Sequence, residues 1–516
     1  MATSSQPGFD VASPLLQQLR ELLLAAGYCE AGIAPTLYER EMNLPGTDAP
    51  PTRLNTLLRL FFVRDDCQPA DVAAALEPLT LAQLQEAGIL REDGQRIAST
   101  VRVQPYERLL FAFRDAPDAP PEEATMLISP SSLDVAHLMI RRPARNALDL
   151  GTGCGFLASL LSPFCEKVQA IDVNPAAIAA AEFNARWNGL RNVTFHTGNL
   201  FEPVAEQRFD LIVCNPPFLI APVTSAFSTR YRFKHSGFEG DTFCINLARE
   251  ASRRLNEDGY FHMIFQFEEY AGQPWSSALE KSFSGLDCDV WVARIESFTA
   301  EDHIAEWLAS LTEAEQEDAA NLGAQARQYF QKKNVVATST GLLTLRRASH
   351  RKNYLWFDES PEDRVEPYGE SLAALFEART KIEETGGAGL LQEKLRASPH
   401  LRLLQTSDIQ DRRWSVAASE LSLTQGLKYS FGDVSEEVLK LVEKFSQGAT
   451  AAQAIGELQH TGLTNKDLVA EYLPKIRELL WYGFLIGAEP DTRHNRVKRV
   501  APRTVRDSTF SGTDKA

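Results

Sequence analysis

Cysteine is scarce in this sequence and follows no regular spacing. The seven cysteines are odd in number, and no two form a C-x-x-C pair; they are Cys29, Cys67, Cys154, Cys165, Cys214, Cys244 and Cys288. Disulfide frameworks and structural zinc sites depend on regularly spaced cysteines, so the pattern argues against both. We therefore expect a protein of the reducing cytoplasm without a metal site.

Long apolar segments are absent as well. No stretch reaches the roughly 18 consecutive apolar residues of a membrane-spanning helix. The first residues, "MATSSQPGFDVASPLL", lack the basic segment and apolar run of a secretory signal. The sequence thus predicts neither secretion nor a membrane span.

Basic residues are fewer than acidic ones: the sequence has 53 Lys and Arg and 69 Asp and Glu, which gives a formal net charge of −16. The field of such a molecule repels a phosphate backbone except where basic residues gather locally. Tight, nonspecific binding of nucleic acid is therefore disfavoured.

What the sequence does have is length. Its 516 residues predict two to four domains. Residues 1–124 are interpreted as an N-terminal helical, winged-helix-like domain with a linker. Amphipathic stretches such as "PLLQQLRELLLAAGY" (14–28) precede the strand-like "RIASTVRVQPYERLLFAFRD" (96–115), and proline and acidic residues mark a linker at 115–124.

Residues 125–353 alternate short apolar runs with helical segments. The runs are "NALDL", "KVQAID", "NVTFH", "FDLIV" and "GYFHMIF". This alternation predicts βαβ units and an α/β, Rossmann-like fold with seven strands. The segments "DVWVAR" and "NVVATSTGLLTLRRA" are expected as edge strands, with a helical insertion at 299–333 between them.

The last third of the chain returns to amphipathic helices. Residues 354–487 are predicted to form a second mainly helical, winged-helix-like domain. Residues 488–516 are too polar to pack and are expected to be a disordered basic tail.

A glycine-rich turn follows the first strand of the predicted sheet, in "NALDLGTGCGFLASLL" (146–161). The strand ends near Asp149, and Gly151, Gly153 and Gly155 lead into an apolar helix. Glycine lets a backbone approach a ligand closely, and a helix N-terminus favours electronegative groups. Alone, the pattern is weak, because such turns also bind dinucleotides or merely tighten a connection.

Three further motifs end the next three strands. Asp172 in "QAIDVN" is placed to accept hydrogen bonds from ribose hydroxyls, although a helix cap is an alternative. In "HTGNLFE" (196–202), Asn199 could bind an adenine that Leu200 covers, although a loop-forming turn is an alternative. "DLIVCNPPFLI" (210–220) ends the fourth strand. Because ligands bind at the carboxyl ends of parallel strands, the four motifs together predict one cofactor crevice.

The ordered motifs "LISPSSLDVA", "DLGTGCG", "AIDVN", "GNLFE" and "NPPF" resemble class I S-adenosylmethionine-dependent methyltransferases. They are most similar to HemK-like protein-glutamine methyltransferases and small-domain rRNA guanine methyltransferases, over roughly residues 125–295. The resemblance implies S-adenosyl-L-methionine as cofactor. It implies cofactor contacts from Asp149, Gly151, Thr152, Gly153, Gly155, Asp172, Asn199, Leu200 and Asn215. It also implies a catalytic acceptor site of Asn215, Pro216, Pro217 and Phe218, which Ser131 and Ser132 are placed to help close.

The Asn-Pro-Pro-Phe motif suits methylation of a planar nitrogen. The Asn215 side-chain oxygen and the Pro216 carbonyl each accept one N–H and aim the nitrogen at the methyl group. Two prolines stiffen the loop and remove backbone donors. Phe218 is expected to stack on the planar acceptor, although a core-packing role is the alternative.

The acceptor is left open among three hypotheses. A protein glutamine, on a partner of the release-factor type, is favoured by the motif and the acidic charge. Phe218 stands where the release-factor enzymes have Tyr, which keeps an rRNA or DNA base as an alternative. Basic residues in "STRYRFKHSGF" (228–238) and in the C-terminal tail point to that alternative. An ordinary solvated loop and a disordered basic tail are the other interpretations, and for the tail the second is preferred. The third hypothesis is a noncatalytic cofactor-binding scaffold, which the intact motif argues against.

Overall fold

The structure is a computed structural model that describes residues 13–29, 52–114, 127–220, 238–309, 311, 316, 318–359, 367–410, 412–458 and 464–487. The predicted linker at 115–124 and the predicted tail at 488–516 lie outside the described residues. The same holds for the basic segment after the acceptor motif, of which Phe238 alone is described.

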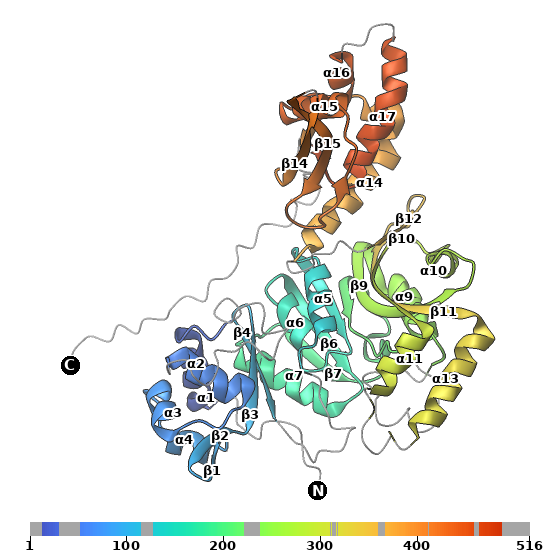
Figure 1. Ribbon diagram of the computed structural model, residues 1–516. Coiled ribbons are helices and arrows are strands. Elements are labelled where there is room, and N and C mark those ends of the chain that lie inside the picture. Colours follow the sequence, from blue (N-terminus) through green and yellow to red (C-terminus); the bar gives the residue numbers. More distant parts are fainter. Residues whose placement is uncertain are drawn as a thin grey trace.

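The centre of the molecule is an eight-stranded sheet with the order β12-β10-β11-β9-β8-β5-β6-β7 (Figure 1). Its strands are β5 (Ala144–Leu150), β6 (Cys165–Asp172), β7 (Val193–Thr197), β8 (Phe209–Cys214), β9 (Leu255–Tyr270), β10 (Cys288–Thr299), β11 (Val335–Arg347) and β12 (Leu355–Glu359). Strands β7, β6, β5, β8 and β9 are mutually parallel, which confirms the Rossmann-like α/β prediction.

Three details of the sheet differ from the prediction. It has eight strands among the described residues, where seven were expected. Strands β10 and β11 lie inside the sheet, because β11 pairs antiparallel with both β9 and β10, and β12 forms the edge beside β10. Because β12 ends at Glu359, the sheet also passes the predicted domain end at residue 353.

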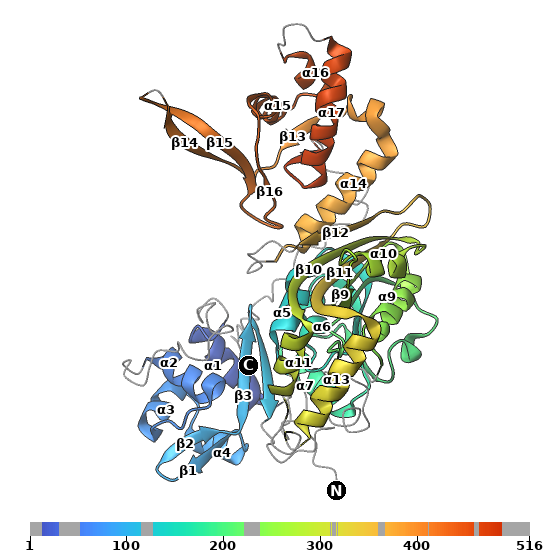
Figure 2. The ribbon, with the colours of Figure 1, turned by 45° about the vertical axis from the view of Figure 1, so that its right-hand side comes forward.

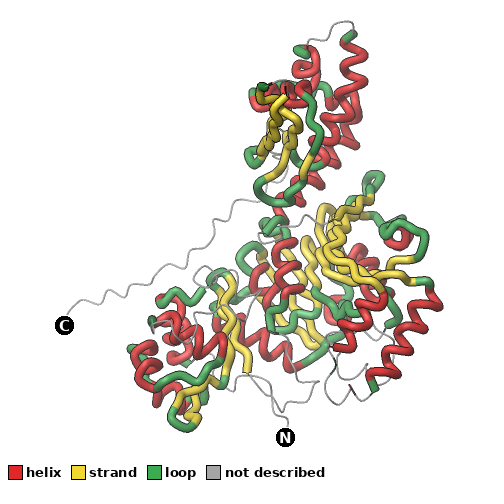
Figure 3. The backbone as a smooth tube through the Cα atoms, in the orientation of Figure 1, coloured by secondary structure: helices red, strands yellow, loops and turns green. Residues whose placement is uncertain are grey.

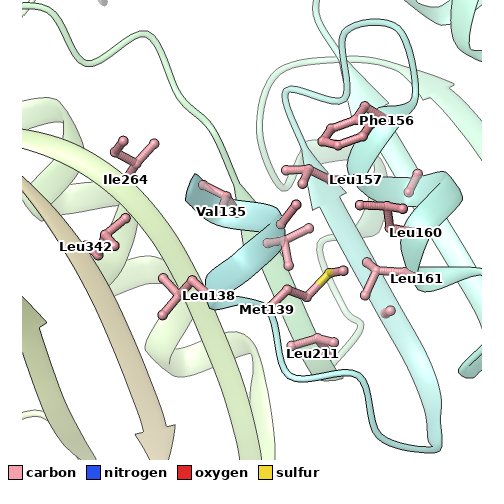
Figure 4. Packing of buried hydrophobic residues seen from close by; sticks show 14 of the residues in the cluster. Val135, Leu138, Met139, Phe156, Leu157, Leu160, Leu161, Leu211, Ile264 and Leu342 are labelled. Carbon is pink, nitrogen blue, oxygen red and sulfur yellow. The ribbon is translucent and has the colours of Figure 1, made fainter. Parts of the chain in front are cut away.

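Helices cover both faces of the sheet, and the alternation of side chains in the strands explains why. Helices α5 (Pro130–Leu138) and α6 (Phe156–Leu161) belong to one apolar cluster, and α9 (Thr242–Arg254) and α10 (Ser277–Phe283) belong to another. In β9, Ile264 faces the first cluster while Met263 and Phe265 face the second. Figure 4 shows α5 side chains between Ile264 and Leu342 of the sheet and Leu157 and Leu161 of α6.

The N-terminal part joins the sheet region through a β-ribbon. Its elements are α1 (Pro14–Ala25), α2 (Arg53–Leu58), η3 (Arg59–Val63), α3 (Pro69–Leu76), α4 (Leu81–Glu86), β1 (Leu90–Asp93), β2 (Arg96–Ser99), β3 (Val101–Tyr106) and β4 (Leu109–Arg114). The amides of Leu110 and Ala112 in β4 donate to Asn188 and Asn184, at 3.0 and 2.9 Å. Both asparagines lie in or just after α7 (Pro175–Trp187), so the ribbon fixes this part to the sheet region (Figure 2).

The C-terminal part contains more strand than the predicted mainly helical domain. Its elements are α14 (Gly369–Leu390), β13 (Leu395–Ala397), β14 (Leu401–Gln410), β15 (Arg413–Leu423), β16 (Ser430–Phe431), α15 (Glu436–Ser446), α16 (Ala451–Gly456), α17 (Asn465–Trp481) and β17 (Leu485–Gly487). Strands β14 and β15 form a long ribbon that projects from the helices in Figure 2, and Figure 3 shows the same strands beside those helices. Both faces of its outer half are exposed, so the strands lack the buried face whose alternation marks a strand in a sequence.

The predicted helical insertion contains two described helices, α11 (Ala300–Ala309) and α13 (Ala319–Lys333), between β10 and β11. None of the described helices is both long and apolar enough to cross a membrane. In the described part of the chain, no group of three or more His, Cys, Asp or Glu side chains is arranged to hold a metal ion.

Candidate functional site

The candidate site lies where the chain reverses its direction of travel across the sheet. From β5 the chain moves outward to β6 and β7, and it then returns to β8 on the other side of β5. Such a switch point leaves a crevice at the carboxyl ends of the strands, where ligands bind. The register aligns Leu150 with Ile171 and with Cys214, so the turns after β5, β6 and β8 meet at this edge.

The glycine turn after β5 has the open backbone that a cofactor needs. Gly151, Gly153 and Gly155 have φ angles of 70°, 53° and 82°, a region that side-chain-bearing residues avoid. A Cβ on Gly153 would meet no atom within 4 Å, so its backbone faces open space. At Gly155 a Cβ would lie 3.0 Å from the Cβ of Ala181, so this glycine allows α6 to begin against α7.

Asp149 is buried beneath this turn. Its Oδ2 accepts hydrogen bonds from the Thr152 hydroxyl at 2.6 Å and from the Ala158 amide at 2.9 Å. Its Oδ1 is buried without a hydrogen-bond partner among the described residues. Burial raises the pKa of this carboxyl from 3.8 to about 7, although the two hydrogen bonds oppose the shift. An unsatisfied acceptor at this place is a fit for a polar or cationic ligand group.

Asp172 connects the end of β6 to the glycine turn. Its Oδ2 accepts the Gly153 amide and its Oδ1 accepts the Asn174 amide, both at 2.9 Å. Burial raises its pKa, and the backbone hydrogen bonds counteract this. Each carboxylate oxygen can accept a second hydrogen bond, so Asp172 has capacity left for a pair of hydroxyls. The helix-cap alternative is not its role, because the side chain of Asn174 caps α7.

Asn215 is held by the first turn of α5. Its Nδ2 donates to the hydroxyls of Ser131 and Ser132, each at 3.0 Å. The Ser129 hydroxyl caps the helix by accepting the Ser132 amide at 3.2 Å. Because both hydrogen bonds use Nδ2, the side-chain oxygen is left to accept an N–H from another molecule. The two serines therefore lie where the sequence placed them, beside Asn215.

Asn199 and Leu200 follow β7 at the same edge of the sheet. Asn199 is exposed, and its side chain donates to Glu202 at 3.3 Å, while Leu200 has a φ of 47°. These features belong to a tight turn, which agrees with the loop alternative. The contact of Asn199 and Leu200 with an adenine stays a prediction.

The Asn-Pro-Pro-Phe segment follows β8. Pro216 is buried, and Phe218 is partly buried against the apolar clusters on both faces of the sheet. Its packing agrees with the core alternative, and the stacking role stays a prediction. The backbone of Ile220, two residues further on, is held by Gln266 and His303, neither of which was predicted as a site residue. A usable signal was the polar Gln266 and Glu268 inside the apolar run "GYFHMIFQFEEY".

Two family models match the chain. The model described as "Methyltransferase small domain" matches residues 129–290, and one described as a domain of unknown function (DUF7059) matches residues 35–102. The first match spans the strand ends and turns described above. Residues 129–290 therefore form a domain similar to the methyltransferase small-domain family.

Among curated relatives, the chain is similar to a release factor glutamine methyltransferase of Salmonella typhimurium, with 31% identity over 36% of this chain and 66% of the relative. A release factor glutamine methyltransferase of Geobacter sulfurreducens is 44% identical over 16% of this chain and 31% of the relative. A ribosomal protein uL3 glutamine methyltransferase of Bradyrhizobium diazoefficiens is 34% identical over 22% of this chain and 38% of the relative. The matches thus span only a third or so of the last two relatives.

Solved structures add little to this picture. A ribosomal protein L11 methylase of Lactobacillus delbrueckii subsp. bulgaricus matches with 22% identity over 31% of this chain and 68% of that chain, at a TM-score of 0.22. A score of this size carries no weight, and the strand order itself defines the fold.

Proposed function

We propose that this protein is an S-adenosylmethionine-dependent N-methyltransferase that modifies a glutamine side chain of a protein of the translation apparatus. The observation that carries the proposal is Asn215, whose amide nitrogen is tied to Ser131 and Ser132 while its oxygen is left to accept. The named relatives, which are glutamine methyltransferases of release factors and of ribosomal protein uL3, support a protein acceptor.

The residues at the switch point fit the proposed cofactor. Asp172 has acceptor capacity for ribose hydroxyls, Gly153 offers open backbone, and the Asp149 carboxylate has an unsatisfied oxygen near the start of α6. When bound, S-adenosylmethionine supplies a methyl group on a cationic sulfur.

The task of the acceptor loop is to orient a weak nucleophile. The lone pair of an amide nitrogen is delocalised, so the nitrogen reacts only when its plane and its N–H groups are fixed. The Asn215 oxygen and the Pro216 carbonyl accept the two N–H groups in this proposal, and Phe218 bounds the plane. A neutral asparagine is not a base, so the proton passes to a carbonyl or to water as the nitrogen takes the methyl group.

We also propose that the flanking parts are winged-helix-like modules that present the acceptor. In the N-terminal part, support comes from the order of helices α2, α3 and α4 before the β1–β2 hairpin, and from the isolated bridge between Cys67 and Ile97. Such modules bind proteins as well as nucleic acids, so the flanking parts do not distinguish the two kinds of acceptor. The preference for a protein acceptor rests on the candidate site.

The proposal is tested by incubating the protein with tritium-labelled S-adenosylmethionine and an extract of cells that lack the gene. We expect label that protease removes and nuclease leaves, and mass spectrometry should find it on glutamine. Label that only nuclease removes would instead identify a base methyltransferase, and binding without any transfer would identify a scaffold.

An asparagine pair sharpens the test. Asn215→Ala should lower the turnover at saturating cofactor roughly 100-fold, because orientation is lost, and should lower the cofactor affinity measured by calorimetry much less, since Asn215 is only one of the expected cofactor contacts. Asn199→Ala should do the reverse, weakening cofactor binding with little loss of saturated turnover. Equal effects of the two substitutions would contradict the separate acceptor and cofactor roles.

A further inference from the structure

The segment that follows the acceptor motif is held by hydrogen bonds from two buried side chains that belong to different elements. The Ile220 amide donates to the Gln266 Oε1 at 3.0 Å, and the Ile220 carbonyl accepts a hydrogen bond from the His303 Nε2 at 2.6 Å. Gln266 comes from β9 and His303 from α11 of the helical insertion. Both polar groups of one peptide residue, five positions after Asn215, are thus fixed by side chains.

The side chains of this segment also belong to the insertion. Ile220 is part of an apolar cluster with Ile304, Trp307 and Phe330, and Leu219 packs against that cluster. Because these partners come from α11 and α13, the core of the insertion is built around the chain that leaves the acceptor motif. A displacement of the insertion would therefore move Leu219 and Ile220 with it.

The insertion is in turn anchored to the sheet. Glu268, buried two residues beyond Gln266, accepts hydrogen bonds from the Tyr329 hydroxyl and, at 2.8 Å, from the Tyr270 hydroxyl. Lys333 lies 3.5 Å from the same carboxylate and donates to Tyr329 at 2.8 Å. Tyr329 and Lys333 belong to α13, so this network ties the second helix of the insertion to β9.

His303 is suited to a fixed structural hydrogen bond. Burial lowers its pKa, so the ring is neutral near pH 7. A neutral ring that donates from Nε2 carries its single proton there, which fixes the tautomer. The His303 ring also makes an edge contact with Phe330, so its orientation is set by the insertion.

We propose that Gln266 and His303 are positioning residues, and that the helical insertion exists to hold the acceptor loop in register with the cofactor crevice. This role rests on the proposed methyl transfer. In it, the prolines stiffen the start of the loop, and the two hydrogen bonds to Ile220 fix its far end. The segment that carries the Asn215 oxygen and the Pro216 carbonyl is thereby fixed at both of its ends.

The experiment compares His303→Leu, which removes the donor, with His303→Gln, whose amide nitrogen can donate from a similar position. In the tritium assay at saturating S-adenosylmethionine, we expect His303→Leu to lower turnover on the order of 10- to 100-fold, and His303→Gln to recover most of it. The calorimetric affinity for S-adenosylmethionine should stay within about twofold of the wild type, since the cofactor turns are not touched. Gln266→Leu should behave like His303→Leu.

Arg327→Ala is the matched control, because it removes only an exposed ion pair between Arg327 and Glu301 within the same insertion. Its turnover and affinity should equal those of the wild type. Wild-type turnover in His303→Leu would overturn the proposal, and so would a loss of turnover that His303→Gln does not recover.

A second measurement separates this inference from the proposed function. Hydrogen exchange of the Ile220 amide should speed up in Gln266→Leu and His303→Leu and stay slow in Arg327→Ala. Unchanged exchange in both leucine variants would overturn the positioning role even if no substrate is labelled. The carrier of the label, protein or nucleic acid, decides the proposed function, whereas the ratio of variant to wild-type rates decides the positioning role.

Discussion

Asp149 combines full burial with one unsatisfied oxygen, and this makes the folded protein sensitive to pH. Because burial raises its pKa from 3.8 to about 7, the folded chain keeps a proton that the unfolded chain releases near pH 4. Its contribution to stability is therefore complete below about pH 4 and is lost as the pH rises through about 7. Ionised Asp149 above that pH is a buried charge that only two hydrogen bonds support.

Asp149→Asn tests this without added cofactor. The amide oxygen can keep both hydrogen bonds, and no charge has to form. The free energy of unfolding of the wild type relative to the variant should fall by a few kcal/mol between pH 4 and pH 8. Urea unfolding at several pH values measures it, and parallel curves for the two proteins would contradict the raised pKa.

The serine pair beside Asn215 gives a second prediction at this scale. In the double variant Ser131→Ala and Ser132→Ala, the Asn215 amide loses both hydrogen bonds, while the Ser129 cap of α5 remains. Turnover should fall roughly 10-fold or more, because a freely rotating amide no longer presents its oxygen. Thermal unfolding should change little, and a single serine variant should lose less than the pair, since one hydroxyl remains.

Residues at strand ends were predictable from sequence because their place is fixed by local pattern. A strand, a glycine turn and a helix put Asp149 and Gly153 at one edge, and Asn215 follows its own strand in the same way. The polar Gln266 inside an apolar run was a signal of a buried partner, but the sequence did not identify that partner, and His303 meets Ile220 only through the folding of an insertion. Asn199 was predicted at the correct edge of the sheet. Its side chain is exposed and donates a hydrogen bond to Glu202, so its contact with a cofactor stays a prediction.

At the scale of elements, the start of α6 depends on close contact with α7. Gly155→Ala should destabilise the protein by about 1–3 kcal/mol, because its φ of 82° strains a side chain and the new Cβ would lie 3.0 Å from that of Ala181. Gly153→Ala is the control, since φ is also positive but the space is open. Denaturant unfolding should show the larger loss for Gly155→Ala, and equal losses would mean that strain alone matters.

Some strands could not be predicted, or could not be placed correctly in the sheet, from the sequence alone. Runs of apolar residues located β5, β6, β8 and β9, but nothing in a run tells whether a strand is central or at an edge, so β10 and β11 were misplaced. The ribbon β14–β15 was missed for another reason. Trp414 and Ile409 face each other across it and are both exposed, so neither strand has the half-buried pattern that identifies strands.

At the scale of the whole molecule, one guanidinium connects the sheet region to the C-terminal part. Arg379 of α14 lies over the ring of Trp356 in β12 at 3.4 Å and over that of Trp481 in α17 at 4.2 Å. Its Nε and Nη2 donate to the Trp481 carbonyl, each at 3.2 Å. Desolvation lowers its pKa to about 10, so it stays charged in the physiological range.

Arg379→Met keeps the volume but removes the charge and the hydrogen bonds. We expect a loss of about 2–3 kcal/mol in the free energy of unfolding, from the stacking and from the unpaired Trp481 carbonyl. Trp414→Ser should change stability by less than about 0.5 kcal/mol, because Trp414 is 73% exposed. Denaturant titration of both variants tests this, and a neutral Arg379→Met would show that the two parts are joined by other contacts.

Helix α5 connects the acceptor loop to the C-terminal part, so the two parts are not independent structural units. Its first turn holds Asn215 through Ser131 and Ser132, and its last turn meets the start of α14, where the Tyr368 amide donates to the His137 carbonyl at 2.9 Å. A Cβ on Gly369 would lie only 2.2 Å from the Met139 carbonyl oxygen, so the two helix ends are in direct contact. The acceptor loop and the C-terminal part thus share one support. A transplant of residues 129–290 into another protein would carry the motif but leave one end of that support without its neighbour.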